Sequence, residues 1–234
     1  MFPLNDTEPN RYSAFPVMTF FIIVLNTVVL MFEYALGAQD VGDLFGFYRL
    51  YGSVPQLILN REGLGAVSAI TSTFVHAGLF HLLSNMWALW VFGRRVEDAC
   101  GPWRFLGYYL LAGLCSDLLS TIVRSQLGRA DIPGVGASGA VFGVMGAYLL
   151  LFPGGRIRTF IMLWFIPMFP KVRALWVILY YLVVQYISAY NVLFNDRGFY
   201  VNYWAHLGGF FACLLIFLFL SPEAFERYWN DQPV

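Results

Sequence analysis

The stretch VGASGAVFG, residues 135–143, places a serine among glycines inside a long apolar segment. No Asp, Glu, Lys or Arg occurs from Ile132 to Gly155. A run of this length can cross a bilayer, which needs about 20 predominantly apolar residues. Ser138 is therefore expected inside a membrane-spanning helix, where a polar hydroxyl requires a structural or a functional reason.

The rest of the chain has the composition of an integral membrane protein. Of its 234 residues, 59% are hydrophobic and 12% are charged, whereas soluble domains carry about 25% charged residues. The 14 basic and 14 acidic residues balance, and no basic patch indicates a nucleic-acid partner. The three cysteines are scattered and form no CxxC pair, so neither a metal site nor a disulfide framework is expected.

Charged residues divide the apolar sequence into six candidate transmembrane helices. They cover residues 16–36, 77–93, 104–123, 134–152, 174–191 and 202–221. We expect one all-α, six-transmembrane-helix domain over 16–221, with short cytoplasmic tails at 1–15 and 222–234. A cleaved signal peptide is the alternative for the first segment, but no basic region precedes it and its apolar run is longer than usual.

Two further apolar stretches are not expected to span. Residues 159–170 hold two prolines within a short segment, which predicts a loop or a segment at the membrane interface. Within the long first outer loop, about 37–76, residues 44–59 interleave aromatic and aliphatic side chains with few charges. This composition predicts a segment resting on the membrane surface, and an ordinary folded loop is the alternative.

The basic residues predict an orientation, because cytoplasmic loops carry an excess of Lys and Arg. With the N-terminus inside, nine basic residues fall on cytoplasmic segments and five on outer segments. Both termini are therefore expected in the cytoplasm. By analogy, the compact architecture favours a bacterial cytoplasmic membrane. No feature of the sequence predicts an oligomeric state.

Three of the predicted helices bring polar side chains to one depth. His81, Ser138 and His206 each lie about four residues beyond the outer end of their helix, roughly 6 Å into the membrane. Asn85 lies one turn deeper on the face of His81. Taken singly, an intramembrane serine usually hydrogen-bonds within or between helices, and a histidine such as His76 near a helix end is often interfacial or anchors a loop.

The common depth favours chemistry over these structural explanations. A serine becomes a nucleophile when a base lies within about 2.6–3.2 Å of its oxygen. Small residues allow two helices to approach closely. Glycines lie near Ser138 at positions 136, 139, 143 and 146, and Gly208 and Gly209 follow His206. Dense helix packing alone is the other explanation for these glycines. Backbone N–H groups at the start of the Ser138 helix, with His81 and Asn85, offer donors for an oxyanion.

At this point the motifs resemble a known family. GASGAVFG (136–143) is similar to the GxSGxxxG serine motif of rhomboid intramembrane proteases. HLLSNMWALWVFG (81–93) resembles their HxxxN helix, and YWAHLGGFFA (203–212) resembles their histidine helix. The similarity covers most of residues 65–220 in order.

The resemblance implies a Ser–His dyad with Ser138 as nucleophile and His206 as general base. It implies that His81, Asn85 and the Ser138 backbone N–H hold the oxyanion, and that Phe142 packs on the histidine. Gly136, Gly139 and Gly209 would support the site, while Cys213 stands where the family usually has a smaller residue.

The resemblance also implies the reaction. Rhomboid proteases cleave single-pass membrane proteins near the outer membrane boundary, without metal or cofactor. The helix at 174–191 and the outer loop 191–201 are candidates for the gate through which the substrate enters from the lipid bilayer.

Other interpretations compete with a dyad protease. Non-catalytic rhomboid-like proteins bind membrane helices, but such relatives typically lack the serine or the histidine. A transporter or channel would favour charges in several helices or internal repeats; the helical segments contain Asp117 and Glu33, and no repeat is visible. Asp117 is also a candidate third member of a triad, although it matches no catalytic position of the family.

Overall fold

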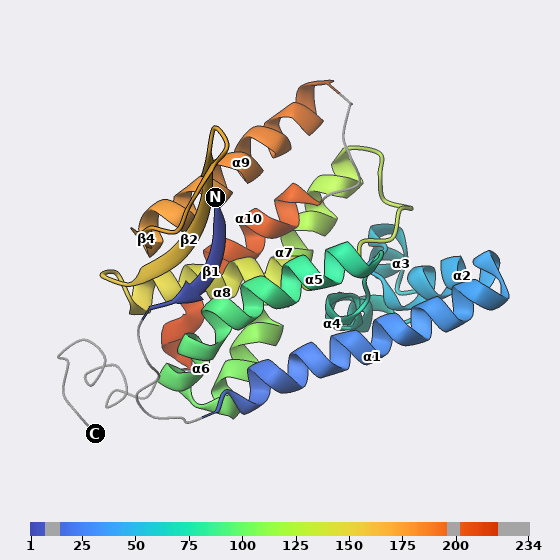
Figure 1. Cartoon of the computed structure of the whole chain (residues 1–234). Helices are drawn as coiled ribbons and strands as arrows, with labels where there is room; N and C mark the ends of the chain where they lie inside the picture. The colour runs from blue at the N-terminus through green and yellow to red at the C-terminus, as the bar shows by residue number, and fades with distance from the viewer. Residues whose placement is uncertain (8–14, 196–201, 220–234) are drawn as a thin grey trace.

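The computed structural model describes residues 1–7, 15–195 and 202–219 and is mostly helical (Figure 1). Its helices are α1 (Val17–Gln39), α2 (Val41–Tyr51), α3 (Pro55–Asn60), α4 (Ser68–Thr71), α5 (Leu79–Ala88), α6 (Arg94–Cys100), α7 (Pro102–Gln126), α8 (Ser138–Leu151), α9 (Ala174–Asn195) and α10 (Tyr203–Phe211). Its strands are β1 (Phe2–Asp6), β2 (Arg156–Leu163), β3 (Ile166–Met168) and β4 (Lys171–Arg173). Part of the predicted N-terminal tail, the whole predicted C-terminal tail, and parts of the gate loop and of the last predicted span lie outside the described residues.

All six predicted spans fall on helices, although these differ in length. Three of them, α1, α7 and α9, are long and apolar enough to cross a membrane. A fourth is reached if the helices at 65–74 and 79–100, which meet at a bend of 85°, count as one span. The apolar helices at Ser138–Leu151 and Tyr203–Leu218 are shorter.

The helix that carries Ser138 starts later than predicted. Residues 134–137 are not helical, and α8 begins at Ser138 itself. Pro133 precedes this segment, and Gly136 adopts a φ of 124°, a conformation that L side chains rarely take. Ser138 is therefore the first residue of its helix, and the expectation that it lies about four residues inside is wrong.

A four-stranded sheet corrects the all-α expectation. β2 forms a hairpin with β3 and also pairs with β4, so residues 159–170 are largely extended rather than an irregular loop. β1, within the predicted N-terminal tail, pairs antiparallel with β2 from Phe2↔Phe160 to Asp6↔Ile157. Alternating burial at the start of β2 is typical of a strand with one covered face.

The closest helix packing lies among α7, α8 and α10. Tyr108 of α7 is fully buried and donates a hydrogen bond of 2.7 Å to the Gly143 carbonyl of α8. The start of α1 is fixed from α6, because Glu97 accepts hydrogen bonds of 2.8 and 2.7 Å from the backbone N–H groups of Met18 and Thr19. The two helices that carry Ser138 and His206 therefore pack together with α7 in a tightly connected core.

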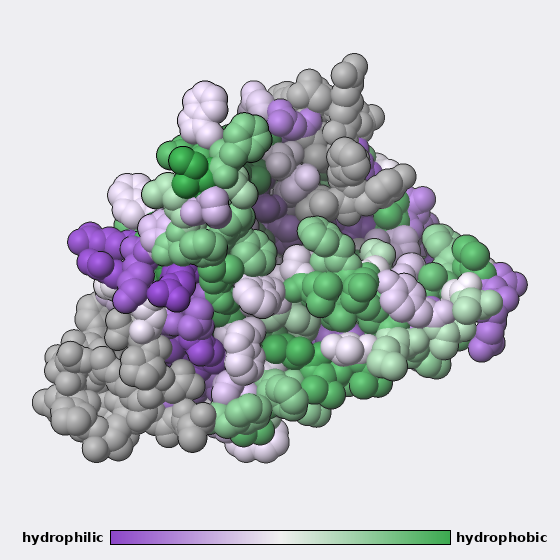
Figure 2. All heavy atoms as spheres, viewed as in Figure 1, coloured by the Kyte–Doolittle hydropathy of each residue, from purple (hydrophilic) through white to green (hydrophobic). Residues whose placement is uncertain are grey.

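The surface shows the expected membrane pattern. Apolar side chains cover α1 and the neighbouring helices in Figure 2, and hydrophilic side chains gather beside the sheet and at the far end of α2. The exposed apolar residues of α1 include Phe20, Val28 and Met31. A belt of exposed apolar side chains between polar ends is what a bilayer requires.

Candidate active site

The structure brings Ser138 and His206 into contact across α8 and α10. His206 Nε2 lies 2.7 Å from Ser138 Oγ, and the imidazole is 7% exposed. Asn202 caps α10 by accepting a hydrogen bond of 3.2 Å from the backbone N–H of Ala205, next to His206. The distance is within the range in which a histidine can take the proton of a serine hydroxyl.

Two other side chains hold the imidazole. Phe142 stacks on it with ring centroids 4.7 Å apart and planes at 11°, as the resemblance implies. On the remaining nitrogen, His206 Nδ1 lies 2.7 Å from Gln185 Oε1 of α9. Gln185 was not among the residues predicted from the sequence, although an amide inside the predicted span 174–191 was the available signal.

Glycines permit this contact by removing side chains from the helix interface. A Cβ on Gly209 would meet the backbone of Gly139, with the Gly139 carbonyl carbon at 2.6 Å. Cys213 is bulkier than the residue usual in the family, and it fits because it faces Gly146. A Cβ added to Gly146 would lie 2.7 Å from the Cys213 Cβ. The helices thus stay close despite the cysteine.

The predicted oxyanion donors lie in one cleft with the Ser–His pair. Its volume is about 570 Å³, and its lining includes His81, Asn85, Ser138 and His206. Gly136 is required beside His81, because a Cβ there would lie 2.6 Å from the imidazole. The first backbone N–H groups of α8 lack helical partners, so the Ser138 end of the helix offers donors as well.

His76 anchors this side of the cleft rather than lying at the interface. Its ring is fully buried, and its Nε2 lies 3.1 Å from Asn85 Nδ2. Its backbone N–H donates to Glu33 of α1 at 3.0 Å, and Tyr48 donates to the same carboxyl group at 3.5 Å. Burial, with the neighbouring Glu33, raises the pKa of Tyr48 to about 12, so the phenol remains a donor at neutral pH.

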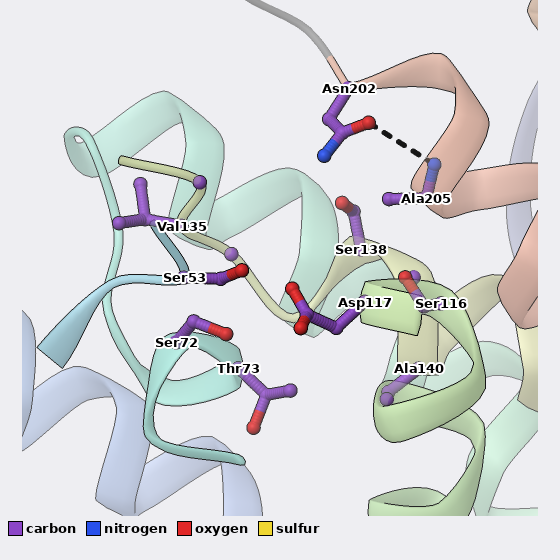
Figure 3. A pocket seen from close by; sticks show the side chains of 14 residues that line it. Ser53, Ser72, Thr73, Ser116, Asp117, Val135, Ser138, Ala140, Asn202 and Ala205 are labelled. Atoms are coloured by element: carbon purple, nitrogen blue, oxygen red, sulfur yellow. Dashed lines mark hydrogen bonds between the residues drawn. The ribbon is translucent and has the colours of Figure 1, made fainter. Parts of the chain in front are cut away.

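Asp117 lies in a second, smaller cavity on the other side of Ser138. This space of about 40 Å³ is lined largely by small and hydroxyl side chains, among them Ser53, Ser72 and Ser116 (Figure 3). Thr121 donates a hydrogen bond of 3.5 Å to the Asp117 carboxyl group. Since Gln185 occupies His206 Nδ1, the geometry of the described residues does not make Asp117 the orienting acid of a triad.

Comparison with known proteins shows which family the chain resembles. A family model described as Rhomboid domain matches residues 65–223. Rhomboid protein 1, mitochondrial, of Saccharomyces cerevisiae is 33% identical over 163 residues, which cover 69% of this chain and 43% of the yeast protein. The presenilin-associated rhomboid-like protein, mitochondrial, of Bos taurus is 37% identical over 100 residues, or 43% of this chain and 25% of the cattle protein.

A plant protein gives a similar match. RHOMBOID-like protein 1 of Arabidopsis thaliana is 34% identical over 163 residues, covering 69% of this chain and 36% of its own length. The matched region thus spans less than half of each of these relatives. Two of them are mitochondrial by name, so they do not support the expected bacterial cytoplasmic membrane. With the serine, histidine and HxxxN segments all inside the matched residues, the chain belongs to the rhomboid family.

Proposed function

We propose that this chain is an intramembrane serine endopeptidase that works through a Ser138–His206 dyad. The observation that carries the proposal is the 2.7 Å contact between Ser138 Oγ and His206 Nε2, two residues that line the same cleft. Serine attack on a peptide bond requires such a base. The proposal needs no metal or cofactor.

The reaction follows the acyl-enzyme route. Ser138 Oγ attacks the substrate carbonyl carbon while its proton passes to His206 Nε2. The oxygen that gains negative charge accepts hydrogen bonds from the Ser138 backbone N–H and from His81 and Asn85. The imidazolium then protonates the departing amine, and a water molecule, activated by the neutral imidazole, releases the acyl group from Ser138.

The substrates we propose are single-pass transmembrane proteins, cut near the outer membrane boundary. In support, α8 has 14 residues, about 21 Å of helix, against a hydrocarbon core of about 30 Å. A short helix that begins at the nucleophile leaves room above Ser138 for water. We further propose six membrane-spanning helices with both termini on the cytoplasmic side, as the basic residues favour.

The second candidate is a non-catalytic membrane-helix-binding protein of the same family. The cleft would serve either function, since its lining is largely apolar apart from a few polar groups. The paired serine and histidine favour the enzyme, because binding alone requires neither side chain.

A fluorophosphonate probe and a reporter transmembrane substrate test the proposal. The purified protein in detergent should be labelled at Ser138 and should cleave the reporter. Ser138→Ala should abolish both, while Ser125→Ala, on α7 with its hydroxyl bonded to the Thr121 carbonyl, should retain both. Undiminished cleavage by a folded Ser138→Ala variant would refute the mechanism.

A further inference from the structure

We propose that Gln185 of α9 is a positioning residue for His206. Its Oε1 atom lies 2.7 Å from His206 Nδ1, on the side of the ring opposite the serine contact. Gln185 lines the cleft and reaches the imidazole from a helix that carries neither member of the dyad. This role rests on the proposed function and adds a third side chain to it.

The protonation of the ring explains why an acceptor is needed there. Ser138 can give its proton to His206 Nε2 only if that nitrogen carries none, so the hydrogen of the neutral ring must sit on Nδ1. An acceptor at Nδ1 selects this tautomer. Gln185 supplies this acceptor through its amide oxygen. Its amide nitrogen is a donor and could not accept the hydrogen that Nδ1 carries.

The same contact persists when the ring becomes charged. After Nε2 takes the serine proton, Nδ1 still donates to Gln185 Oε1, so the ring need not turn between steps. Phe142 fixes the plane of the imidazole by stacking, but stacking permits two ring orientations, related by a 180° turn about the Cβ–Cγ bond. The hydrogen bond at Nδ1 selects the orientation that directs Nε2 at Ser138.

Four variants separate positioning from general stability. Gln185→Met has nearly the same shape but no strong acceptor, and Gln185→Asn is one methylene too short to reach. Gln185→Glu keeps an oxygen at the same distance. Ile187→Met, on the exposed face of α9, is the matched control. We expect kcat to fall about tenfold in the Met and Asn variants with little change in KM, and to be largely retained in the Glu and control variants.

The spectroscopic readout is the tautomer itself. Nitrogen-15 shifts of labelled histidine distinguish Nδ1–H from Nε2–H, and the chain has only three histidines to assign. His206 should be Nδ1–H in the wild type and lose that preference in Gln185→Met. Wild-type kcat in Gln185→Met, or a lower kcat with an unchanged His206 signal, would overturn the role. A wild type that is neither labelled by fluorophosphonate nor active would instead refute the proposed function.

A separate set of contacts lies at the other end of the cleft, where β1 stands between α5 and α9 (Figure 1). The Trp87 indole N–H of α5 donates a hydrogen bond of 2.6 Å to the Pro3 carbonyl, and the Phe2 ring stacks on Trp87 with ring centroids 5.7 Å apart. From α9, the Tyr181 hydroxyl donates a hydrogen bond of 3.0 Å to the Met1 carbonyl. Phe2, Pro3, Trp87 and Tyr181 all line the cleft.

From these contacts we infer that Met1–Pro3 form a strap across the lateral opening between α5 and α9, which releases when a substrate helix enters. The strap again rests on the proposed function. α9 packs on α10 and α8, so β1 joins it to α5 across the cleft. Tyr181 and Gln185 lie four residues apart on one face of α9, and the strap thus holds the face that also contacts His206.

The side-chain contacts at the two ends of β1 differ in strength, which indicates which end can be released. At its far end, Asp6 forms a buried ion pair of 3.0 Å with Arg95, and the Asn5 side-chain oxygen accepts a hydrogen bond of 2.5 Å from the Arg94 guanidinium. At the strap, the hydrogen bonds join neutral groups, and these are weaker than charge-assisted ones. Met1–Pro3 can therefore release Trp87 and Tyr181 while β1 remains anchored at Asp6 and paired with β2.

The test compares two readouts that depend differently on access through the bilayer. Cleavage of a transmembrane reporter requires lateral entry, whereas a small fluorophosphonate reaches Ser138 from water. The double variant Trp87→Phe with Tyr181→Phe keeps an aromatic ring at each position but removes both donors. We expect the ratio of reporter cleavage to probe labelling to rise about fivefold. Tyr180→Phe should cause no change, because Tyr180 is 42% exposed, does not line the cleft and keeps its edge contact with the Tyr181 ring in the variant.

A crosslink provides the opposite perturbation. Phe2→Cys with Trp87→Cys, in a background without the three native cysteines, should be joined by a short bifunctional thiol reagent that a reductant cleaves. The joined protein should lose reporter cleavage relative to probe labelling and regain it on reduction. An unchanged ratio in the double variant, or a confirmed crosslink without effect, would overturn the strap. Absence of probe labelling in the wild type would refute the proposed function instead.

Discussion

Gly209→Ala should lower turnover by about 10²-fold by separating the two helices that carry the proposed dyad. A Cβ at this position would press on the Gly139 carbonyl, 2.6 Å from its carbon and 3.1 Å from the Gly139 Cα. Carbon atoms pack at about 3.5–4.0 Å, and the obstacle is backbone that no rotamer change can move. The helices α8 and α10 must therefore move apart by about 1 Å at this point.

This displacement acts directly on the proposed catalytic contact. Gly139 follows Ser138 in the chain, and Gly209 lies about one turn after His206. The Oγ–Nε2 distance, 2.7 Å in the structure, would grow to about 3.7 Å, beyond hydrogen-bond range. A misplacement of about 1 Å costs about 10²-fold in rate, whereas overpacking costs about 1–3 kcal/mol of stability.

Turnover of a reporter substrate and thermal unfolding, both on purified protein, measure the two effects. Gly154→Ala is a control without neighbours, since nothing lies within 4 Å of the added Cβ. Gly107→Ala is an overpacking control that lies away from the dyad. Its added Cβ would be 3.0 Å from the Phe219 side chain. Both controls should keep near wild-type turnover. A folded Gly209→Ala variant within threefold of wild-type turnover would refute this reasoning.

Three further predictions concern the polar residues around the cleft. His206→Ala should lower turnover nearly as much as Ser138→Ala, and the double variant should be hardly worse than either, because base and nucleophile act as a unit; additive losses would contradict a shared step. His81→Ala and Asn85→Ala should each slow turnover by up to about 10²-fold, because one oxyanion donor is lost and backbone donors remain; wild-type kcat in both would make them structural. Asp117→Asn should retain most activity with a modest change in unfolding temperature; a folded variant slowed by about 10⁴-fold, the scale for a lost triad aspartate, would make the enzyme a triad protease.

Much of the fold followed from the order of apolar and charged residues. Each of the six predicted segments lies on a helix, because a long uncharged run has few alternatives to a helix in a bilayer. The pairing of Ser138 with His206, and the stacking of Phe142 on the histidine, followed from motifs and their resemblance to a family. These features depend on residue types at short spacings, which a linear sequence displays directly.

Other features depended on contacts between distant segments. β1 pairs with β2 across more than 150 residues, and no local pattern in residues 1–15 indicated a partner. The start of α8 was likewise predicted several residues too early. The apolar sequence continues through 134–137, but the φ of 124° at Gly136 is not helical.

The side chains that orient the site were decided by tertiary structure alone. Gln185 reaches His206, and His76 reaches Asn85, because α9 and the segment before α5 pack beside the cleft. The sequence determined which residues have the chemistry that the proposed serine protease needs and that they lie in apolar segments. Which neighbour holds each of them in place depends on helix rotation and packing, and these are set by the whole core rather than by any single segment.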